Sequence, residues 1–190
     1  VLGFIGFARP WHGLDRVVRA LAAHAAHSDR PLGKAVLLIG GEGPALPEVR
    51  ALAEQLGVAS RVIFAGIVER TAVPGFIDAF DVALQPQATA YASPLKLFEY
   101  LARGACVLAP RQDNITEVVV DGTSAALFDP DRASDFETRL EQLAEDSELR
   151  ARIGAAARAR LIERDFTWAG NARRVTALAE ELVRVRCGTA

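Results

Sequence analysis

The sequence predicts an α/β fold, a Rossmann-like doubly wound parallel sheet of about six strands with helices on both faces. Six short apolar runs alternate with amphipathic segments along the chain. Runs such as "AVLLI" and "CVLA" are apolar at every position, as expected of parallel strands that helices cover on both sides. No linker or low-complexity segment divides residues 1–190, so we expect a single domain.

The strands are expected where the apolar runs lie, and each should lead into a loop. The runs are "VLGFIGFA" (1–8), "AVLLIGG" (35–41), "RVIFAG" (61–66), "DVALQP" (81–86), "ACVLAP" (105–110) and "SAALF" (124–128). Ligands of such sheets bind beyond the carboxyl ends of the strands. The candidate site loops are therefore "GFARPWHG", "GGEGP", "GIVER", "QPQATAYASP" and "PRQDN".

The helices are expected between these runs. The first, "GLDRVVRALAAHAAH" (13–27), has apolar residues at helical spacing at Leu14, Val17, Val18, Leu21 and Ala25. Further helical segments are "ALPEVRALAEQLGV", "TAVPGFIDAF", "SPLKLFEYLARG" and "NITEVVVDG". The rest of the chain is expected to be helical, from "RASDFETRLEQLAED" to "TALAEELVRVR", with the last helix at about 167–186.

Composition restricts the class of protein. The formal net charge of −2 provides no general electrostatic footprint for DNA, RNA or an anionic membrane. We find no span-length apolar run and no signal peptide, and Cys106 and Cys187 are expected to be free thiols, so we expect a cytoplasmic protein. Val1 opens directly into a strand, which leads us to expect one domain of a longer protein.

The segment "SPLKLFEYLARG" (93–104) contains a cation in an unusual place. Ser93 suits an N-cap, Pro94 the first helical position and Gly104 the C-terminal end. Lys96 then lies in the first turn, where the helix dipole disfavours a cation by about 0.3–1 kcal/mol. The chain has 22 basic residues, of which only Lys34 and Lys96 are lysines, so this position calls for a specific explanation.

Two interpretations of this helix are open. Its wheel places Leu95, Leu97, Phe98, Leu101 and Ala102 on one arc and Lys96, Glu99 and Arg103 on the other. The polar arc is either a solvated face with a Glu99–Arg103 pair, or part of a site. In the second case Lys96 and the free N–H groups bind an anion, and Glu99 accepts hydrogen bonds from hydroxyls of the same ligand.

The other candidate motifs are weaker. "GGEGP" (40–44) has neither GxGxxG spacing nor GK[ST], so a tight turn and a phosphate contact are both open. In "GFARPWHG", Gly13 opens a helix beside Arg9 and His12, which suits either an anion or a plain surface loop. His24 and His27 have metal-binding spacing but no accompanying acidic cluster, so we expect no metal site. We find no hydrolase triad or GxSxG elbow.

Taken in order, these segments resemble the C-terminal, donor-binding domain of a GT-B glycosyltransferase of the family 4 type (glycosyl transferases group 1). The resemblance covers nearly the whole chain. It rests on the order and spacing of "GFARPWHG", "IGGEGP", "VIFAGIV", "DVALQP", "SPLKLFEYLARGACVLAP", "ITEVVVDGTSAALF" and "DFTWAGNARRV".

The resemblance implies a retaining transfer of a sugar from a nucleoside diphosphate donor, without a metal or other cofactor. It places the chemistry at Lys96 and Glu99, with Glu99 on the ribose, and the acceptor site in an N-terminal domain that is absent from these residues. That domain would bring any peripheral contact with the inner face of a membrane, and the last helix would cross back to it. The remaining implied contacts are with the diphosphate (Gly6, Arg9, His12, Gly13, Ser93, Pro94, Leu95 and Lys96), the base (Gly66, Ile67 and Val68) and the donor sugar (Tyr91 and Ala92).

The chain departs from the commonest family pattern at three places. Phe7 and His12 replace the usual arginine and lysine of the first loop, Tyr91 replaces the first of two spaced glutamates, and Pro94 replaces a glycine. We interpret Lys96, with Arg9 and His12, as a substitute diphosphate clamp. The departures also leave open a non-catalytic module built on the same fold, and a nucleotide-sugar epimerase has the same two-domain architecture.

Overall fold

The computed structural model describes residues 1–93, 95–132 and 134–187, and within them a six-stranded parallel sheet. The strand order is β3-β2-β1-β4-β5-β6. The strands are β1 (Leu2–Ile5), β2 (Leu37–Gly40), β3 (Val62–Gly66), β4 (Val82–Leu84), β5 (Val107–Pro110) and β6 (Ala126–Phe128). The fold class and all six strands are as predicted. The order reverses between β1 and β4, which is where ligands of open α/β sheets bind.

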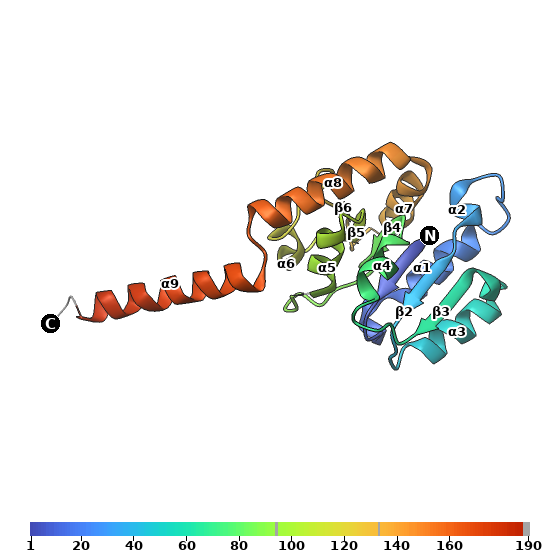
Figure 1. Cartoon of the computed structure of the whole chain (residues 1–190). Coiled ribbons are helices and arrows are strands. Elements are labelled where there is room, and N and C mark those ends of the chain that lie inside the picture. Colours follow the sequence, from blue (N-terminus) through green and yellow to red (C-terminus); the bar gives the residue numbers. More distant parts are fainter. Residues whose placement is uncertain (94, 133, 188–190) are drawn as a thin grey trace.

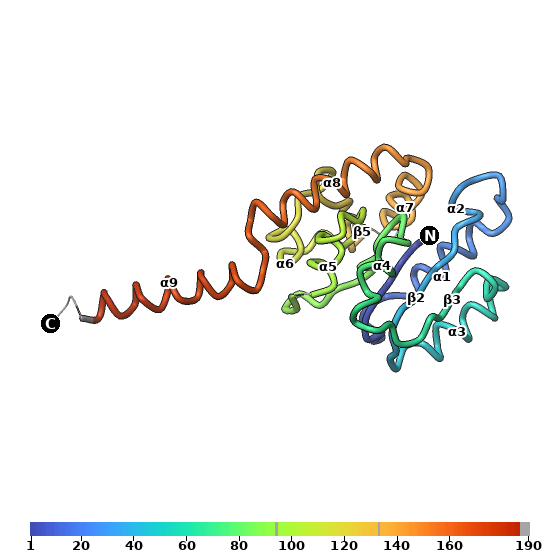
Figure 2. The backbone as a smooth tube through the Cα atoms, viewed as in Figure 1, coloured from blue at the N-terminus to red at the C-terminus, as the bar shows by residue number. Residues whose placement is uncertain are grey.

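Helices cover both faces of the sheet (Figure 1). They are α1 (Leu14–Ala23), α2 (Pro31–Lys34), α3 (Leu46–Gln55), α4 (Val73–Asp78), α5 (Leu95–Arg103), α6 (Asp113–Thr116), α7 (Asp135–Glu145), α8 (Ser147–Glu163) and α9 (Trp168–Cys187), with single 3₁₀ turns at Pro10–His12 and Ala59–Arg61. The tube in Figure 2 follows the same path from the sheet through α7 and α8 to α9.

Two cores lie on opposite faces because successive strand side chains point to opposite sides. Phe4 belongs to the core formed with α1, α3 and α7, whereas its neighbour Ile5 belongs to the core formed with α4, α5, α6 and α8. Each fully buried residue of this size stabilises the fold by about 1.5–3 kcal/mol. Cys106 is buried in the first core as a free thiol, and burial raises its pKa to about 12.

The first helix is shorter than predicted. It ends at Ala23, and Ala25, which we expected on its apolar face, is exposed in a turn. Here α2 packs so closely against the turn that a Cβ at Gly33 would lie only 1.9 Å from the carbonyl oxygen of His27. His24 Nε2 lies 3.2 Å from Glu141 Oε1 of α7, so one histidine of the predicted pair is held by a carboxylate.

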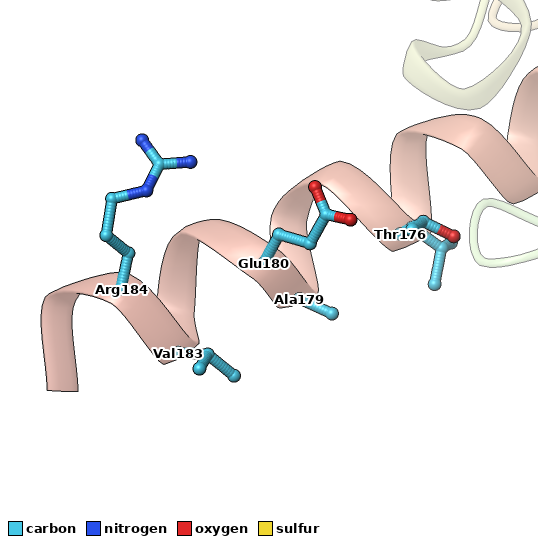
Figure 3. Close-up of a pocket in the computed structure, with 6 residues that line it drawn as sticks. Thr176, Ala179, Glu180, Val183 and Arg184 are labelled. Atoms are coloured by element: carbon cyan, nitrogen blue, oxygen red, sulfur yellow. The ribbon is translucent and has the colours of Figure 1, made fainter. Parts of the chain in front are cut away.

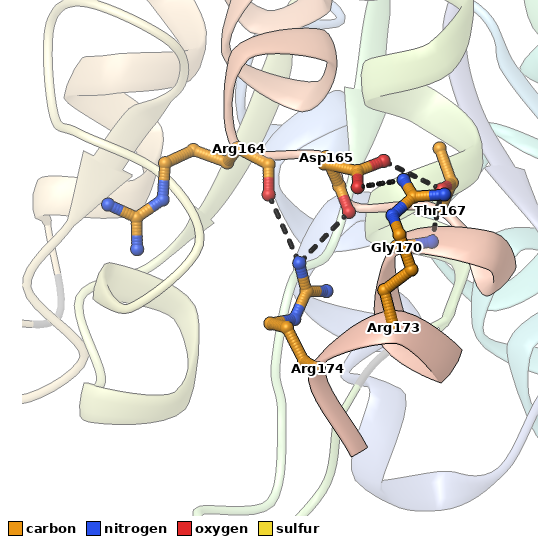
Figure 4. A network of polar contacts seen from close by, with 6 residues as sticks. All are labelled: Arg164, Asp165, Thr167, Gly170, Arg173 and Arg174. Carbon is orange, nitrogen blue, oxygen red and sulfur yellow. Dashed lines mark hydrogen bonds and ion pairs between the residues drawn. The ribbon is translucent and has the colours of Figure 1, made fainter. Parts of the chain in front are cut away.

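The last helix leaves the rest of the molecule. Figure 1 shows α9 extending away from the sheet, and apart from Gly170 its residues 168–186 are exposed. The corner before it is built around Asp165, whose φ of 49° is left-handed. The Asp165 carboxylate pairs with Arg173 and accepts a hydrogen bond from Thr167 Oγ1 at 2.9 Å (Figure 4). Among the described helices, none is long and apolar enough to cross a bilayer.

Candidate functional site

A cavity of about 380 Å³ lies beyond the carboxyl ends of β1 and β4, between the first loop and the start of α5. Its position matches the topological switch point of the sheet. Its walls are formed by Ile5, Gly6, Trp11, His12, Gln85, Ala88, Thr89, Ala92, Ser93, Leu95, Lys96 and Glu99. Of the residues predicted to bind a ligand, it therefore collects Gly6, His12, Ala92, Ser93, Leu95, Lys96 and Glu99. Pro94 lies outside the described residues.

A buried tyrosine holds this crevice open. β1 and β4 pair only at Leu2–Val82 and Gly3–Ala83. Beyond that point Tyr100 Oη accepts a hydrogen bond from the Ile5 N–H at 3.2 Å and donates one to the Leu84 carbonyl at 3.5 Å. Burial raises the pKa of Tyr100 well above its ordinary value, so its hydroxyl stays protonated and can donate. Tyr100 thus links α5 to both strands beside the cavity.

The predicted arc of α5 was partly wrong. Leu97 and Leu101 are buried, but Tyr100 is fully buried with them, whereas Leu95 is 64% exposed and Ala102 is exposed. Tyr100 is three residues after Leu97 and adjacent to Leu101, so the helical period could have identified it. The sequence reasoning missed it because a tyrosine hydroxyl needs a buried partner, and its partners are strand backbone groups.

Lys96 lies in the first turn of α5, as predicted, and its side chain is largely buried. Its Nζ lies 3.2 Å from His12 Nε2 and 4.4 Å from the centroid of the Phe4 ring. Burial lowers the pKa of Lys96 to about 8, and the charge of Glu99 opposes that shift. Gly6 lies against this side chain: a Cβ there would lie in ordinary contact with Lys96 Cε, at 3.4 Å, and the φ of 130° is what favours glycine.

His12 faces two donors. The Arg9 N–H lies 3.1 Å from its Nδ1, and Lys96 Nζ lies 3.2 Å from its Nε2. Burial, with Lys96 and Arg9 nearby, lowers the pKa of His12 to about 4, so the ring is neutral at pH 7. A neutral imidazole has a single acceptor nitrogen. One of the two contacts therefore lacks an acceptor, and an anionic oxygen placed beside Lys96 would supply it.

Apart from Gly6, Trp11 and His12, the residues of the first loop lie outside the cavity lining. The Arg9 guanidinium carbon lies 4.9 Å from the Phe7 ring centroid and 5.1 Å from that of Trp11, so Arg9 packs on exposed aromatic rings. Gly13 begins α1 with φ 68°, and its N–H is directed at the Pro10 carbonyl at 3.3 Å. The structure thus places Arg9 and Gly13 beside the cavity but not in its wall.

The second glycine-rich loop, "GGEGP", packs on the first. A Cβ at Gly41 would lie 2.2 Å from the Gly6 carbonyl oxygen, and one at Gly43 would lie 2.1 Å from that of Ala8. The Ala8 N–H donates to the Glu42 carbonyl at 2.6 Å, which ties the two loops together. These glycines serve backbone packing, which favours the tight-turn interpretation of this motif.

The residues predicted to contact a base follow β3. Gly66 has φ 71° and open space around its Cα, and Ile67 is 69% exposed. They do not line the cavity. Since β2 separates β3 from β1, the two strand ends are about 10 Å apart, a span that a nucleotide could bridge.

A wider groove of about 1200 Å³ adjoins the cavity between α5, α6 and the α8–α9 corner. Glu99, Ala92 and Ser93 border both, whereas Tyr91, 90% exposed, borders only the groove. Asn114 donates to the Thr89 and Ala92 carbonyls at 3.0 and 2.5 Å and so holds the loop between them. A further hollow lies along α9, but its lining comes from that helix alone (Figure 3).

The described residues contain no group of three or more His, Cys, Asp or Glu side chains that could hold a metal ion. The polar groups that line the cavity are one cation, Lys96, one carboxylate, Glu99, and neutral hydrogen-bonding side chains such as His12 and Gln85. The site is therefore one that an oxygen-rich anionic ligand fits, at the switch point of a doubly wound sheet.

Comparison with known proteins identifies the family to which this chain belongs. Residues 1–160 match the family model for glycosyl transferases group 1, and the chain is a member of that family. The D-inositol 3-phosphate glycosyltransferase of Corynebacterium kroppenstedtii is 30% identical over 198 residues, which cover all of this chain and 43% of that protein. The chain therefore spans less than half the length of this curated relative.

Solved structures with the same fold include glycosyltransferases. Anabaena HepE, in complex with UDP and glucose, has a TM-score of 0.79 at 20% identity, over 94% of this chain and 48% of that one. The C-terminal domain of a glycosyl transferase group 1 protein from Francisella tularensis has a TM-score of 0.72 at 20% identity, over 86% of this chain and 84% of that one. These likenesses show that the fold is that of a GT-B domain.

Proposed function

We propose that this domain binds the donor of a retaining glycosyltransferase, a nucleoside diphosphate sugar, with the diphosphate in the cavity beside Lys96. The observation that carries the proposal is a largely buried lysine that forms no ion pair, although the charge of Glu99, one helical turn away, acts on it. Among the described residues, no ion pair includes Lys96, and its neighbours are a neutral imidazole and an aromatic ring. A buried charge without a counterion is costly, and an incoming anion would remove that cost.

The rest of the donor extends from this point. Glu99 is one turn along α5 from Lys96 and borders the cavity, so its carboxylate suits the ribose hydroxyls. The end of β3, at Gly66 to Val68, suits the base. HepE, a protein of the same fold, was solved in complex with UDP, which supports a nucleotide as the ligand of this fold.

The chemistry that this site favours is departure of a diphosphate. The bond between C1 of the sugar and the β-phosphate oxygen breaks while C1 bonds to the acceptor oxygen on the same face. The acceptor proton passes to the leaving phosphate. Because His12 Nδ1 accepts the Arg9 N–H, the proton of the neutral ring is on Nε2, and this N–H and Lys96 stabilise the negative charge that develops on that phosphate. This step needs no nucleophile from the protein.

We propose that α9 packs against a further domain of the same protein, and that this domain binds the acceptor. The exposed apolar residues Trp168, Val175, Leu178 and Leu182 are spaced by seven, three and four residues and so lie along one face of the helix. The curated relative is more than twice as long as this chain, so the longer protein has residues to cover that face. Residues 1–190 alone are then expected to bind donor without transferring sugar.

Calorimetric titration with UDP and GDP tests the donor site. We expect one of these nucleotides to bind and Lys96→Met to weaken it by about 10- to 100-fold, the loss expected for a charge-assisted hydrogen bond. Glu99→Gln should weaken it less, because the amide oxygen still accepts one hydroxyl. Lys34→Met is the matched control, since it removes the other lysine, which precedes β2 at the opposite end of the sheet. No binding by the folded wild type would contradict the proposal.

A further inference from the structure

The cavity wall contains a buried glutamine, Gln85, that the diphosphate site does not use. It directly follows β4, and its side chain is 1% exposed. Its Nε2 donates to the Gln87 carbonyl at 2.5 Å. This contact fixes the orientation of the carboxamide, because the opposite orientation would place two oxygen atoms against each other.

The other end of that carboxamide has no partner. Among the described residues, no donor reaches Gln85 Oε1, although the atom is buried. Buried polar atoms are almost always hydrogen-bonded, so each exception calls for an explanation. The neighbouring strand residues Val82, Ala83 and Leu84 are apolar, and an apolar side chain at this position would avoid the penalty.

The chemistry of the oxygen restricts what it can bind. A carbonyl oxygen accepts hydrogen bonds and repels the oxygens of a diphosphate, so its partner must be a donor group. In the proposed binding mode the ribose hydroxyls lie at Glu99. The hydroxyls that remain on the donor are those of the transferred sugar, which is attached to the diphosphate beside Lys96.

We propose that Gln85 Oε1 accepts a hydrogen bond from a hydroxyl of the transferred sugar and so contributes to the choice of that sugar. This inference rests on the proposed donor site. Tyr91, the residue that the family resemblance places on the sugar, is 90% exposed and lines the outer groove instead. Gln85 offers a buried acceptor in its stead. Lys96 also lines the cavity, and its flexible stem can move toward the phosphate and admit the sugar.

The test compares a nucleotide with its own sugar conjugate, in the longest natural chain that contains this sequence. Affinities for UDP and UDP-glucose, and for GDP and GDP-mannose, are measured by calorimetry. For the pair that binds, Gln85→Leu should lower the preference for the conjugate over the bare nucleotide by about tenfold, the effect of one hydrogen bond to a buried acceptor. The affinity for the bare nucleotide should stay the same.

The chain offers a matched control. Gln112 has the same unpaired buried Oε1 but lines neither the cavity nor the groove. Gln112→Leu should leave the preference unchanged. Because Gln85→Leu also loses the hydrogen bond to the Gln87 carbonyl, both variants are titrated at a temperature at which their circular dichroism shows them folded. In addition, deoxy analogues of the bound conjugate should show one position whose removal weakens the wild type but not Gln85→Leu.

Each result has a distinct meaning. If Gln85→Leu weakens the nucleotide and its conjugate equally, or changes neither, the sugar contact is refuted while the donor site stands. If the folded wild type binds neither nucleotide, the proposed function fails, and the role of Gln85 fails with it.

Discussion

Two glycine-rich loops lie side by side at the carboxyl edge of the sheet and use their glycines differently. In the first loop, Gly6 faces a flexible side chain, since a Cβ there would lie 3.4 Å from Lys96 Cε. In the second, Gly41 and Gly43 face backbone oxygens of the first loop, which would lie 2.2 and 2.1 Å from a Cβ at these two positions. The first loop borders the cavity, and the second supports it from behind.

The comparison shows why glycine content is a weak signal for a phosphate site. A glycine is required wherever a Cβ would collide, and the colliding group can belong to a ligand, a side chain or another loop. The sequence shows the requirement but not the group. The two loops therefore differ in which variants should affect stability and which should affect binding.

The largest effect is expected at Gly43. Gly43→Ala combines a φ of 148° with a collision against the Ala8 carbonyl oxygen and should lower the free energy of unfolding by about 3 kcal/mol. Gly6→Ala has a similar φ penalty, but its Cβ contacts only the Lys96 side chain. We therefore expect it to lower the free energy of unfolding less than Gly43→Ala does, and to lower the affinity for UDP more. Urea unfolding and calorimetry measure both. If the two variants lowered the free energy of unfolding equally, the two loops would not differ in how they use their glycines.

A smaller loss is expected at the base of the first loop. Tyr100→Phe leaves the Ile5 N–H and the Leu84 carbonyl without their buried partner and should lower the free energy of unfolding by about 1–3 kcal/mol. Tyr91→Phe is the control for stability, because its hydroxyl is on a side chain that is 90% exposed. If both variants unfold at the same urea concentration, Tyr100 does not hold the crevice.

The charge of Lys96 predicts a pH dependence at the first loop. Affinity for UDP-glucose should fall as pH rises through about 8, because Lys96 then loses its proton. Lys96→Arg should bind with little change up to pH 9, since a guanidinium stays charged. Titrations at fixed ionic strength between pH 7 and 9 measure this. If the affinity of the wild type changed as little with pH as that of the arginine variant, Lys96 would not be the group that binds the diphosphate.

The same pKa has a consequence for stability. Because the native pKa of about 8 lies below the ordinary 10.5, the unfolded chain binds a proton between these values that the native chain does not. Stability should therefore rise with pH across that window and be fully gained above 10.5. Urea midpoints of wild type and Lys96→Met isolate this contribution, because the variant lacks it.

The smallest effect is expected at the side chain of the second loop. Glu42 is exposed, and only its carbonyl contacts the first loop. Glu42→Ala should change UDP affinity by less than about twofold, the range expected of a surface substitution. The change in UDP affinity is measured by calorimetry and compared with the change caused by Lys96→Met. A loss as large as that of Lys96→Met would show that the second loop binds the ligand after all.

The sequence by itself determined the order of strands and helices and the position of Lys96 and Glu99 on the start of α5. These features depend on the periods of two and 3.6 residues and on residues that favour helix ends. Such signals are local, so they can be recognised within one short segment of the sequence. The family resemblance then indicated which strand ends would hold the nucleotide. The length of α1 was overestimated, because docking of α2 on the following turn is not a local property.

Only the tertiary structure decided the contacts that give the site its character. His12 meets Lys96 across 84 residues, and Ile5 meets Tyr100 across 95. Gln85 Oε1 is unpaired because no hydrogen-bond donor among the described residues reaches it. The role of each glycine depends on which atoms of another segment lie beside its Cα. Such facts depend on packing between segments that the crossovers bring together, and no local pattern encodes the distance between two side chains so far apart in the chain.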